Sequence, residues 1–334
     1  MHIMEGFLPI EWAVFWTIVC IPFLVLGIRA MRKLFVEHPE KKLSLALSGA
    51  FIVILSSLKI PSVGGSSSHP TGTGMGVMLS GPWITAVICT IVLLFQGTFM
   101  AHGGFTTLGA NVFSMGIAGP FAAYLVFKAL RARNANPTAT VFVTVFVADI
   151  VTYLVTSLQL TLIVPYSGMS AFIDAYATFF GIFAVTQIPI ALVEGILMVF
   201  FFQYLADVRP ELVRGVGYDL SARNTKSILS GKESGKMDRS LVMLVCFAII
   251  GVAMILLAYI TTFFFDIGGT DDAGAGMIGD LIPGYETLTD NFIQLGEFGI
   301  SILFIIQTVI GIALLAFALH RYKRKKQHDY DAQE

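Results

Sequence analysis

The sequence has few charged residues and few cysteines. Charged residues make up 13% of its 334 positions, hydrophobic residues 56%, and the net charge is -1. This composition excludes a soluble globular protein, and the charge balance excludes the basic stripe of a nucleic-acid-binding protein. The three cysteines lie inside apolar runs without CxxC spacing, which is typical of small buried side chains: Cys20, Cys89 and Cys246.

Two motifs are also missing. No GxxxxGK[ST] stretch occurs, so the chain lacks the phosphate-binding loop that would let it hydrolyse ATP by that route. No Lys or Arg precedes Arg29, so the first apolar run lacks the basic start of a secretory signal. We therefore expect that run to remain as a membrane span.

Long apolar runs dominate the chain, with a mean hydropathy of +0.79, and predict an all-α polytopic membrane protein. We expect about seven helices in a first module and a two-helix hairpin in a second. The expected spans are 8–28, 43–58, 75–95, 99–115, 116–130, 138–164 and 172–205, followed by 241–265 and 298–319. The predicted domains are 1–206, a cytoplasmic linker at 207–239, a two-span domain at 240–320 with an external loop at 266–294, and a basic tail at 321–334.

Basic residues set the expected orientation. Lys and Arg gather at 29–42, at 128–133, in the linker and in the tail. The positive-inside rule places these segments in the cytoplasm, which puts the N-terminus outside the cytoplasmic membrane and the C-terminus inside. Residues 96–116 are interrupted by glycines, and either a broken crossing or a re-entrant loop would fit them.

The opening stretch MHIMEGFLP offers a metal chelate. The Met1 amine, the His2 amide nitrogen and a His2 ring nitrogen are consecutive donors that close small rings in nearly one plane. Planar nitrogen sites suit Ni(II), Cu(II) and low-spin Co(II), whereas zinc prefers a tetrahedron. A His at position two is also a common accident. The candidate fourth donor is His69, in a polar loop that we expect on the same side as Met1, and the alternative is a solvated loop histidine.

Three ionisable residues, His102, Asp149 and Glu194, lie in otherwise apolar stretches. An ionised group there costs several kcal/mol and is often functional. The other interpretation is that Asp149 and Glu194 are neutral or hydrogen-bonded and only lock helices together. His102, followed by two glycines that let other groups approach, is expected beneath the metal.

Five motifs together resemble the CbiM/NikM family, the substrate-capture subunits of energy-coupling-factor cobalt and nickel importers. They are MHIMEGFLP, SSSHPTGTGMG at 66–76, HGGFTTLGANVFSMG at 102–116, ADIVTYLVTSLQL at 148–160 and PIALVEGIL at 189–197. The resemblance covers about residues 1–225 and implies that the metal is held by the Met1 amine, the His2 amide and ring nitrogens, and His69. Around these ligands or along the ion's path we expect His102, Thr106, Asn111 and Glu5.

The stretch GGTDDAGAGMIGDLIPGYE at 268–286 is similar to the two-span CbiN subunit, which assists metal loading in cobalt systems. Glu286-Thr287 stands where that family pattern has Pro-Trp. The resemblance implies a fusion of capture subunit and accessory, and it favours cobalt over nickel. Asp271 and Asp272 are expected in a loading loop, with ordinary solvated charges as the alternative.

The predicted function is the substrate-specific component of an ATP-driven importer of Co(II). The resemblance implies CbiO-like ATPase subunits and a CbiQ-like coupling subunit as partners, beside membrane lipid, and no cofactor beyond the transported Co²⁺ or Ni²⁺. The alternatives are the same role for nickel, a passive metal channel, a metal sensor, or a membrane enzyme that uses His102 with Asp149 or Glu194. No nucleophile and base stand at a recognisable spacing, so we expect no enzymatic activity.

Overall fold

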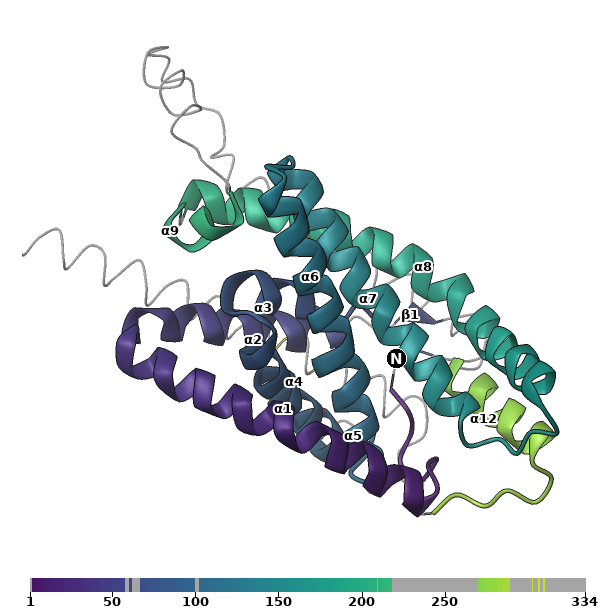
Figure 1. The fold of residues 1–334 in the computed structure, drawn as a ribbon. Helices are drawn as coiled ribbons and strands as arrows, with labels where there is room; N and C mark the ends of the chain where they lie inside the picture. Colours follow the sequence, from purple (N-terminus) through teal and green to yellow (C-terminus); the bar gives the residue numbers. More distant parts are fainter. Residues whose placement is uncertain are drawn as a thin grey trace, which may run out of the picture.

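The computed structural model describes residues 2–57, 60–61, 67–99, 102–208, 210–217 and 270–288, together with 302, 306 and 309. This part of the chain is almost entirely helical (Figure 1), which confirms the all-α class. Within it, five helices are long and apolar enough to cross a membrane. The chain is therefore a multi-pass membrane protein.

The spanning helices are α1 (Ile10–Glu37), α4 (Pro82–Phe99), the continuous stretch of α5 (Leu108–Asn111), η2 (Val112–Ala118) and α6 (Gly119–Ala132), α7 (Pro137–Thr161) and α8 (Met169–Val208). The shorter elements are η1 (Pro39–Lys41), α2 (Lys42–Ser57), α3 (Thr73–Ser80), α9 (Pro210–Val213), η3 (Arg214–Val216) and α12 (Thr270–Leu281). Strands β1 (Ile60–Pro61) and β2 (Ser67–Ser68) form a short antiparallel pair.

The expected boundaries within 75–130 are wrong. Gly81, with φ +80°, separates α3 from α4, so the span expected at 75–95 is two helices. Residues 102–107 are not helical, and one helix then runs without a break from Leu108 to Ala132. Its segment η2 is π-helical, which keeps the backbone hydrogen-bonded where we had expected a break at 115–116.

The other predicted spans either correspond to helices of the structure or lie outside the described residues. The spans predicted at 138–164 and 172–205 correspond to α7 and α8. The spans predicted at 241–265 and 298–319 and most of the linker lie outside the described residues.

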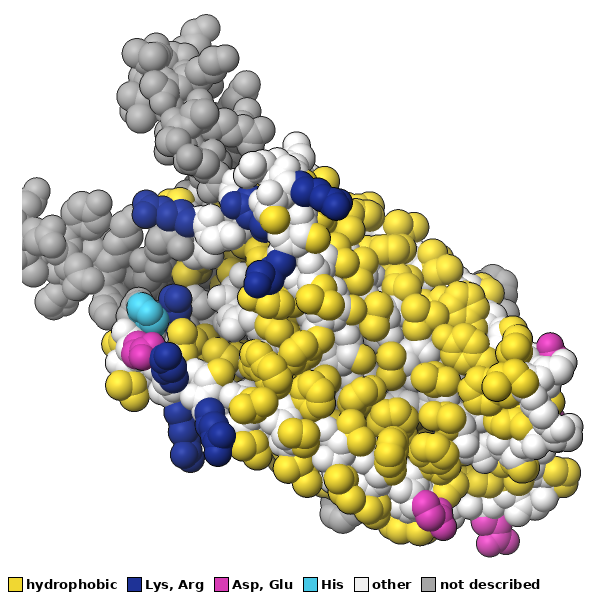
Figure 2. Space-filling model, viewed as in Figure 1, with side chains coloured by type: hydrophobic (Ala, Val, Ile, Leu, Met, Phe, Trp, Pro, Cys, Tyr) yellow, Lys and Arg dark blue, Asp and Glu magenta, His cyan; other side chains and the backbone are white. Residues whose placement is uncertain are grey.

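The surface matches a lipid environment. On α8 the exposed side chains of Val185, Ile188, Leu192 and Ile196 recur every three or four residues, so they form one apolar stripe. Figure 2 shows hydrophobic side chains over most of the visible face, while Lys and Arg gather at the end that carries α9 and the connection from α1 to α2. An apolar body with basic residues gathered at one end is typical of a membrane protein.

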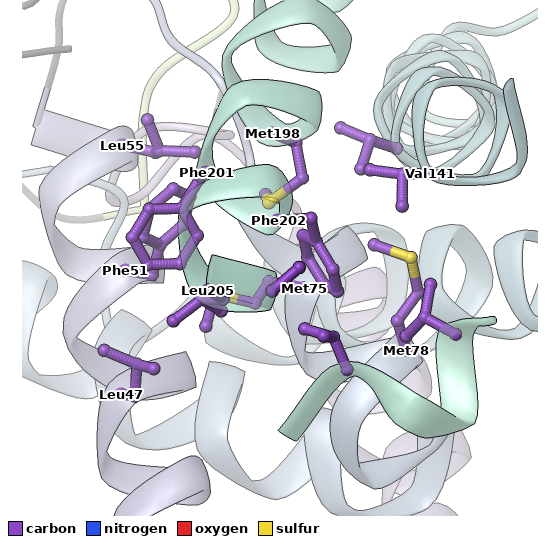
Figure 3. Packing of buried hydrophobic residues seen from close by; sticks show 14 of the residues in the cluster. Leu47, Phe51, Leu55, Met75, Met78, Val141, Met198, Phe201, Phe202 and Leu205 are labelled. Atoms are coloured by element: carbon purple, nitrogen blue, oxygen red, sulfur yellow. The ribbon is translucent and has the colours of Figure 1, made fainter. Parts of the chain in front are cut away.

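One hydrophobic cluster packs α2 and α3 against α8. Figure 3 shows its side chains, and the rings of Phe51 and Phe201 lie 4.5 Å apart between centroids. Met75 of α3 and Met198 of α8 are completely buried in it. The start of α3, and with it the loop before α3, is thereby fixed to α8.

A second cluster joins the N-terminal segment to α12. Ile3 and Leu8 are buried together with Phe179 and Phe183 of α8 and with Ile278 of α12. Residues close to the start of the chain therefore pack against residues about 270 positions later.

Candidate metal centre

Residues 2–9 form no helix and run into the interior. Gly6 has φ +74°, a conformation that glycine adopts without steric cost, and Pro9 immediately precedes α1. In Figure 1 the segment leads from the start of α1 back among the helices. His2 and Leu8 are 2% and 0% exposed, so the segment is part of the core.

Two side chains of one polar turn hold the backbone of Ile3. The Asn111 side chain accepts a hydrogen bond from the Ile3 N–H at 2.8 Å and donates one to the Ile3 carbonyl at 3.0 Å. The Thr107 hydroxyl donates to the same carbonyl at 2.9 Å. Because Ile3 follows His2 directly, these bonds fix where the His2 side chain can lie.

The Glu5 carboxylate ties the same segment to the non-helical stretch before α5. It accepts hydrogen bonds from the Phe105 N–H and from the Thr106 N–H and hydroxyl, and the Thr106 hydroxyl in turn accepts from the Gly6 N–H at 2.9 Å. A Cβ on Gly104 would lie 2.6 Å from the Glu5 Cβ, so only glycine permits this approach.

The loop that carries His69 is held by polar side chains of α8. Glu194 accepts hydrogen bonds from the Thr71 N–H at 2.7 Å and the Gly72 N–H at 2.9 Å. The Gln187 amide donates to the His69 carbonyl at 3.3 Å and to Asp149 of α7 at 2.8 Å. Asp149 and Glu194 are thus hydrogen-bonded, as the second interpretation of these residues predicts, and they hold the loop of His69 directly or through Gln187.

Three imidazoles from distant parts of the chain meet between these two supports. His2 Nδ1 lies 3.0 Å from His69 Nε2 and 2.6 Å from His102 Nε2. All three side chains are buried, and one nitrogen from each lies within 4.8 Å of the others. Among the described residues, these three imidazoles make up a group that could hold a metal, and ring nitrogens suit a metal that prefers nitrogen ligands.

The hydrogen bond of His69 determines which of its nitrogens is available. His69 Nδ1 lies 2.9 Å from the Pro70 carbonyl oxygen. A carbonyl can only accept, so Nδ1 carries the proton and the neutral ring has its lone pair on Nε2, the atom that faces His2.

The nitrogen that His2 presents is the one that suits a chelate. His2 Nδ1 and the His2 amide nitrogen can close a six-membered ring with one ion, and the preceding amine would add a five-membered ring. Met1, the source of that amine, lies outside the described residues.

The other candidate residues have distinct places. Glu5, Thr106 and Asn111 anchor the segment that carries His2. Asp271 and Asp272 belong to α12, and their side chains lie outside the described part of the structure. Two residues that hold the segments of His2 and His69, Thr107 and Gln187, were not predicted from the sequence. Thr107 could have been found from its i, i+4 relation to Asn111; Gln187 gave no signal beyond being a polar residue in an apolar helix.

Residues 277–288 cover the N-terminal segment. The Tyr285 hydroxyl donates to the Phe7 carbonyl at 2.8 Å, and the Leu288 N–H donates to the Gly6 carbonyl at 2.8 Å. Burial raises the pKa of Tyr285, so its hydroxyl stays protonated and able to donate at neutral pH. Asp280 and Glu286 of this stretch are exposed.

Comparisons with known proteins show the family of the chain. Residues 2–212 match the family CbiM, described as the cobalt uptake substrate-specific transmembrane region, and residues 237–332 match CbiN, a cobalt transport protein component. The cobalt transport protein CbiM of Nostoc sp. is 50% identical over 211 residues, 63% of this chain and 80% of that protein. The protein of the same name from Carboxydothermus hydrogenoformans is 52% identical over 206 residues, 62% of this chain and 83% of its own length.

Solved structures show the same fold. Two crystal structures of a transition metal transporter, one of them truncated, align with a TM-score of 0.53 at 21% and 22% identity. Each covers 62% of this chain, and the alignments include 99% and 93% of those chains. The chain therefore belongs to the CbiM family of substrate-specific transmembrane components of cobalt uptake, with a CbiN-like segment fused behind it.

Proposed function

We propose that this chain is the substrate-specific component of an energy-coupling-factor importer and that it captures Co(II) with the Met1 amine, the His2 amide and Nδ1 nitrogens, and His69 Nε2. The observation that carries the proposal is the 3.0 Å separation of His2 Nδ1 and His69 Nε2 in a buried position. Two nitrogens bound at right angles to one ion at about 2.0 Å lie about 2.8 Å apart. The two rings are thus already spaced for one shared ion.

The donor set bears on the choice of metal. Four nitrogens in a plane suit Ni(II) and low-spin Co(II) better than zinc, magnesium or calcium. The CbiM-like and CbiN-like parts of the chain, both similar to cobalt transport proteins, support cobalt. The alternative is the same role for Ni(II), because the geometry suits both ions.

The energy for uptake would come from other subunits. Accumulating a scarce cation against a gradient needs a source of free energy, and the sequence has no phosphate-binding loop. We therefore assign ATP hydrolysis to CbiO-like partners and coupling to a CbiQ-like membrane subunit, and no enzymatic activity to this chain. The basic end of the molecule would face the cytoplasm, and the N-terminus and the connection of 266–294 would lie outside.

The CbiN-like connection would assist loading by holding the N-terminal segment. Support for this role comes from the hydrogen bonds of Tyr285 and Leu288 to the backbone of residues 6 and 7 and from Ile278 in the shared cluster. Deleting 266–294 should then abolish uptake, and unaltered uptake would remove this connection from the mechanism.

The first test is the metal content and affinity of protein with an unmodified start, after growth with cobalt and nickel. His69→Ala and a form with extra residues ahead of Met1 serve as variants. We expect about one cobalt ion per chain, lost in both variants. Unaltered binding in both would refute the ligand set. Reconstitution of the chain alone distinguishes a passive channel, which would conduct the ion without ATPase partners.

A further inference from the structure

We propose that Glu194 is a positioning residue that fixes the tautomer and orientation of His69 through the Pro70–Thr71 peptide group. This inference rests on the proposed function insofar as His69 is a metal ligand. It assigns Glu194 a task in metal capture although its carboxylate bonds to the loop backbone and not to an imidazole.

The first link is the ring of His69. Its Nδ1–H donates to the Pro70 carbonyl at 2.9 Å, which leaves Nε2 as the atom with the lone pair. The loss of this bond would free the ring to rotate or to move its proton to Nε2, where it would block a metal.

The second link is the peptide that contains this carbonyl. The Pro70 C=O and the Thr71 N–H belong to one planar unit and point in opposite directions, so whatever fixes the N–H also fixes the carbonyl. Glu194 accepts this N–H at 2.7 Å with one oxygen and the Gly72 N–H at 2.9 Å with the other. The Glu194 carboxylate is completely buried and accepts hydrogen bonds from two successive peptide N–H groups.

The surrounding backbone also restricts the movement of the loop that Glu194 holds. Gly72 has φ +70°, and a Cβ there would lie 2.8 Å from Ile52 Cα, so the loop touches α2 on its other side. Pro70 fixes its own φ and has no N–H to offer a competing bond. The carbonyl of His69 itself accepts a hydrogen bond from the Gln187 amide, which also donates to Asp149.

The resulting chain runs from a buried carboxylate through a peptide group and an imidazole to the metal position. Metal-binding histidines commonly donate their second ring N–H to a carboxylate or a backbone carbonyl, and removal of that partner typically costs 10–100-fold in affinity. Here the carbonyl is the direct partner, and the carboxylate acts on the carbonyl. Hydrogen bonds in such a chain polarise one another, so Glu194 also makes the Pro70 carbonyl a better acceptor.

The test combines a tautomer measurement with metal titration. Nitrogen NMR of ¹⁵N-histidine protein without metal reports which ring nitrogen of His69 carries the proton, with His69→Ala used to assign the signal. We expect the Nδ1–H tautomer in the wild type and a mixture in Glu194→Gln, in which an amide NH₂ replaces one acceptor. Co²⁺ affinity should fall about 10–100-fold in Glu194→Gln.

Thr71→Val is the matched control. It removes the hydroxyl that lies 3.4 Å and 3.5 Å from the two Glu194 oxygens but keeps the Thr71 N–H. Because the peptide N–H is kept, the Nδ1–H tautomer should persist and Co²⁺ affinity should fall less than in Glu194→Gln, and a loss equal to that of Glu194→Gln would overturn the peptide link.

The outcomes separate this inference from the proposed function. If His69→Ala binds Co²⁺ like the wild type, the proposed ligand set is wrong. If His69→Ala loses binding while Glu194→Gln retains full affinity and the Nδ1–H tautomer, the positioning role alone is wrong. Should Glu194→Gln fail to fold, the wild-type spectrum still decides, because an Nε2–H tautomer contradicts the first link.

Discussion

Replacing Asn111 with Leu should weaken metal binding without touching any ligand. Leu has nearly the same volume, so packing is kept, but both hydrogen bonds from the side chain to Ile3 are lost. The Ile3 carbonyl keeps the Thr107 hydroxyl, whereas the Ile3 N–H loses the Asn111 oxygen inside the protein. Leaving a buried N–H unpaired costs about 1–3 kcal/mol, and a neutral hydrogen bond contributes about 1 kcal/mol net.

The combined penalty is about 2–4 kcal/mol for the position of the N-terminal segment among the helices. Since 1.4 kcal/mol is a factor of ten, Co²⁺ affinity should fall about 30- to 700-fold. Competition titration of detergent-solubilised protein against a coloured cobalt chelator measures this change. Thermal unfolding of the metal-free protein shows whether the helices themselves are intact.

Ser114→Ala is the control for Asn111→Leu. Ser114 is also buried and lies one turn further along the same helix, but its hydroxyl bonds only to the Ala110 and Asn111 carbonyls of its own helix. Its affinity should remain near wild type. Wild-type affinity in Asn111→Leu, or an equal loss in Ser114→Ala, would refute the anchoring role.

Three further predictions concern the same segment and its cover. Gly104→Ala should abolish cobalt uptake by cells because its methyl group displaces Glu5. Gly97→Ala should leave uptake unchanged, because its Cβ would lie 3.8 Å from the nearest atom of the described residues outside its own helix. Tyr285→Phe keeps the ring but loses the hydrogen bond to the Phe7 carbonyl, so the rate of amide hydrogen exchange in 277–288 should rise about 2- to 10-fold. An exchange rate equal to that of the wild type would show that this bond is not formed. Co²⁺ affinity should rise with pH, because the amine, amide and imidazole donors must all lose protons, and a pH-independent titration would contradict the nitrogen ligand set.

Composition and hydropathy were sufficient to predict two of the spanning helices, α7 and α8. The 138–164 and 172–205 runs became α7 and α8 because a long apolar run in a bilayer has no alternative to a helix. The region from 75 to 130 was harder. Its glycines signal irregular backbone, but the same residue allows a positive φ at Gly81 and close helix packing at Gly116, and only the neighbouring helices decide which occurs.

The sequence indicated the imidazoles and, around them, Glu5, Thr106 and Asn111, but it did not indicate which groups these residues bond to. His2 and His69 were identified from donor chemistry and loop position, and the structure brings them together with His102. Glu194 and Gln187 act on the loop of His69 across more than a hundred residues, and no spacing rule reports such a contact. Glu5 showed no sign of its partners because these are mostly backbone N–H groups, which every sequence contains.

The two halves of the site are supported by different parts of the fold, and this bears on metal choice. His2 is positioned by residues 105–111, and the loop of His69 by α7 and α8. Buried hydrogen bonds order both halves before an ion binds. The positions of the ligands are therefore set in advance, and little conformational entropy is lost on binding. The planar arrangement of the proposed ligand set would suit Ni(II) and low-spin Co(II), whereas zinc would reach its preferred tetrahedron only by moving the loop of His69 against Glu194 and Gln187. In the proposed site, selectivity therefore depends on the rigidity of these supports as much as on the ligands themselves.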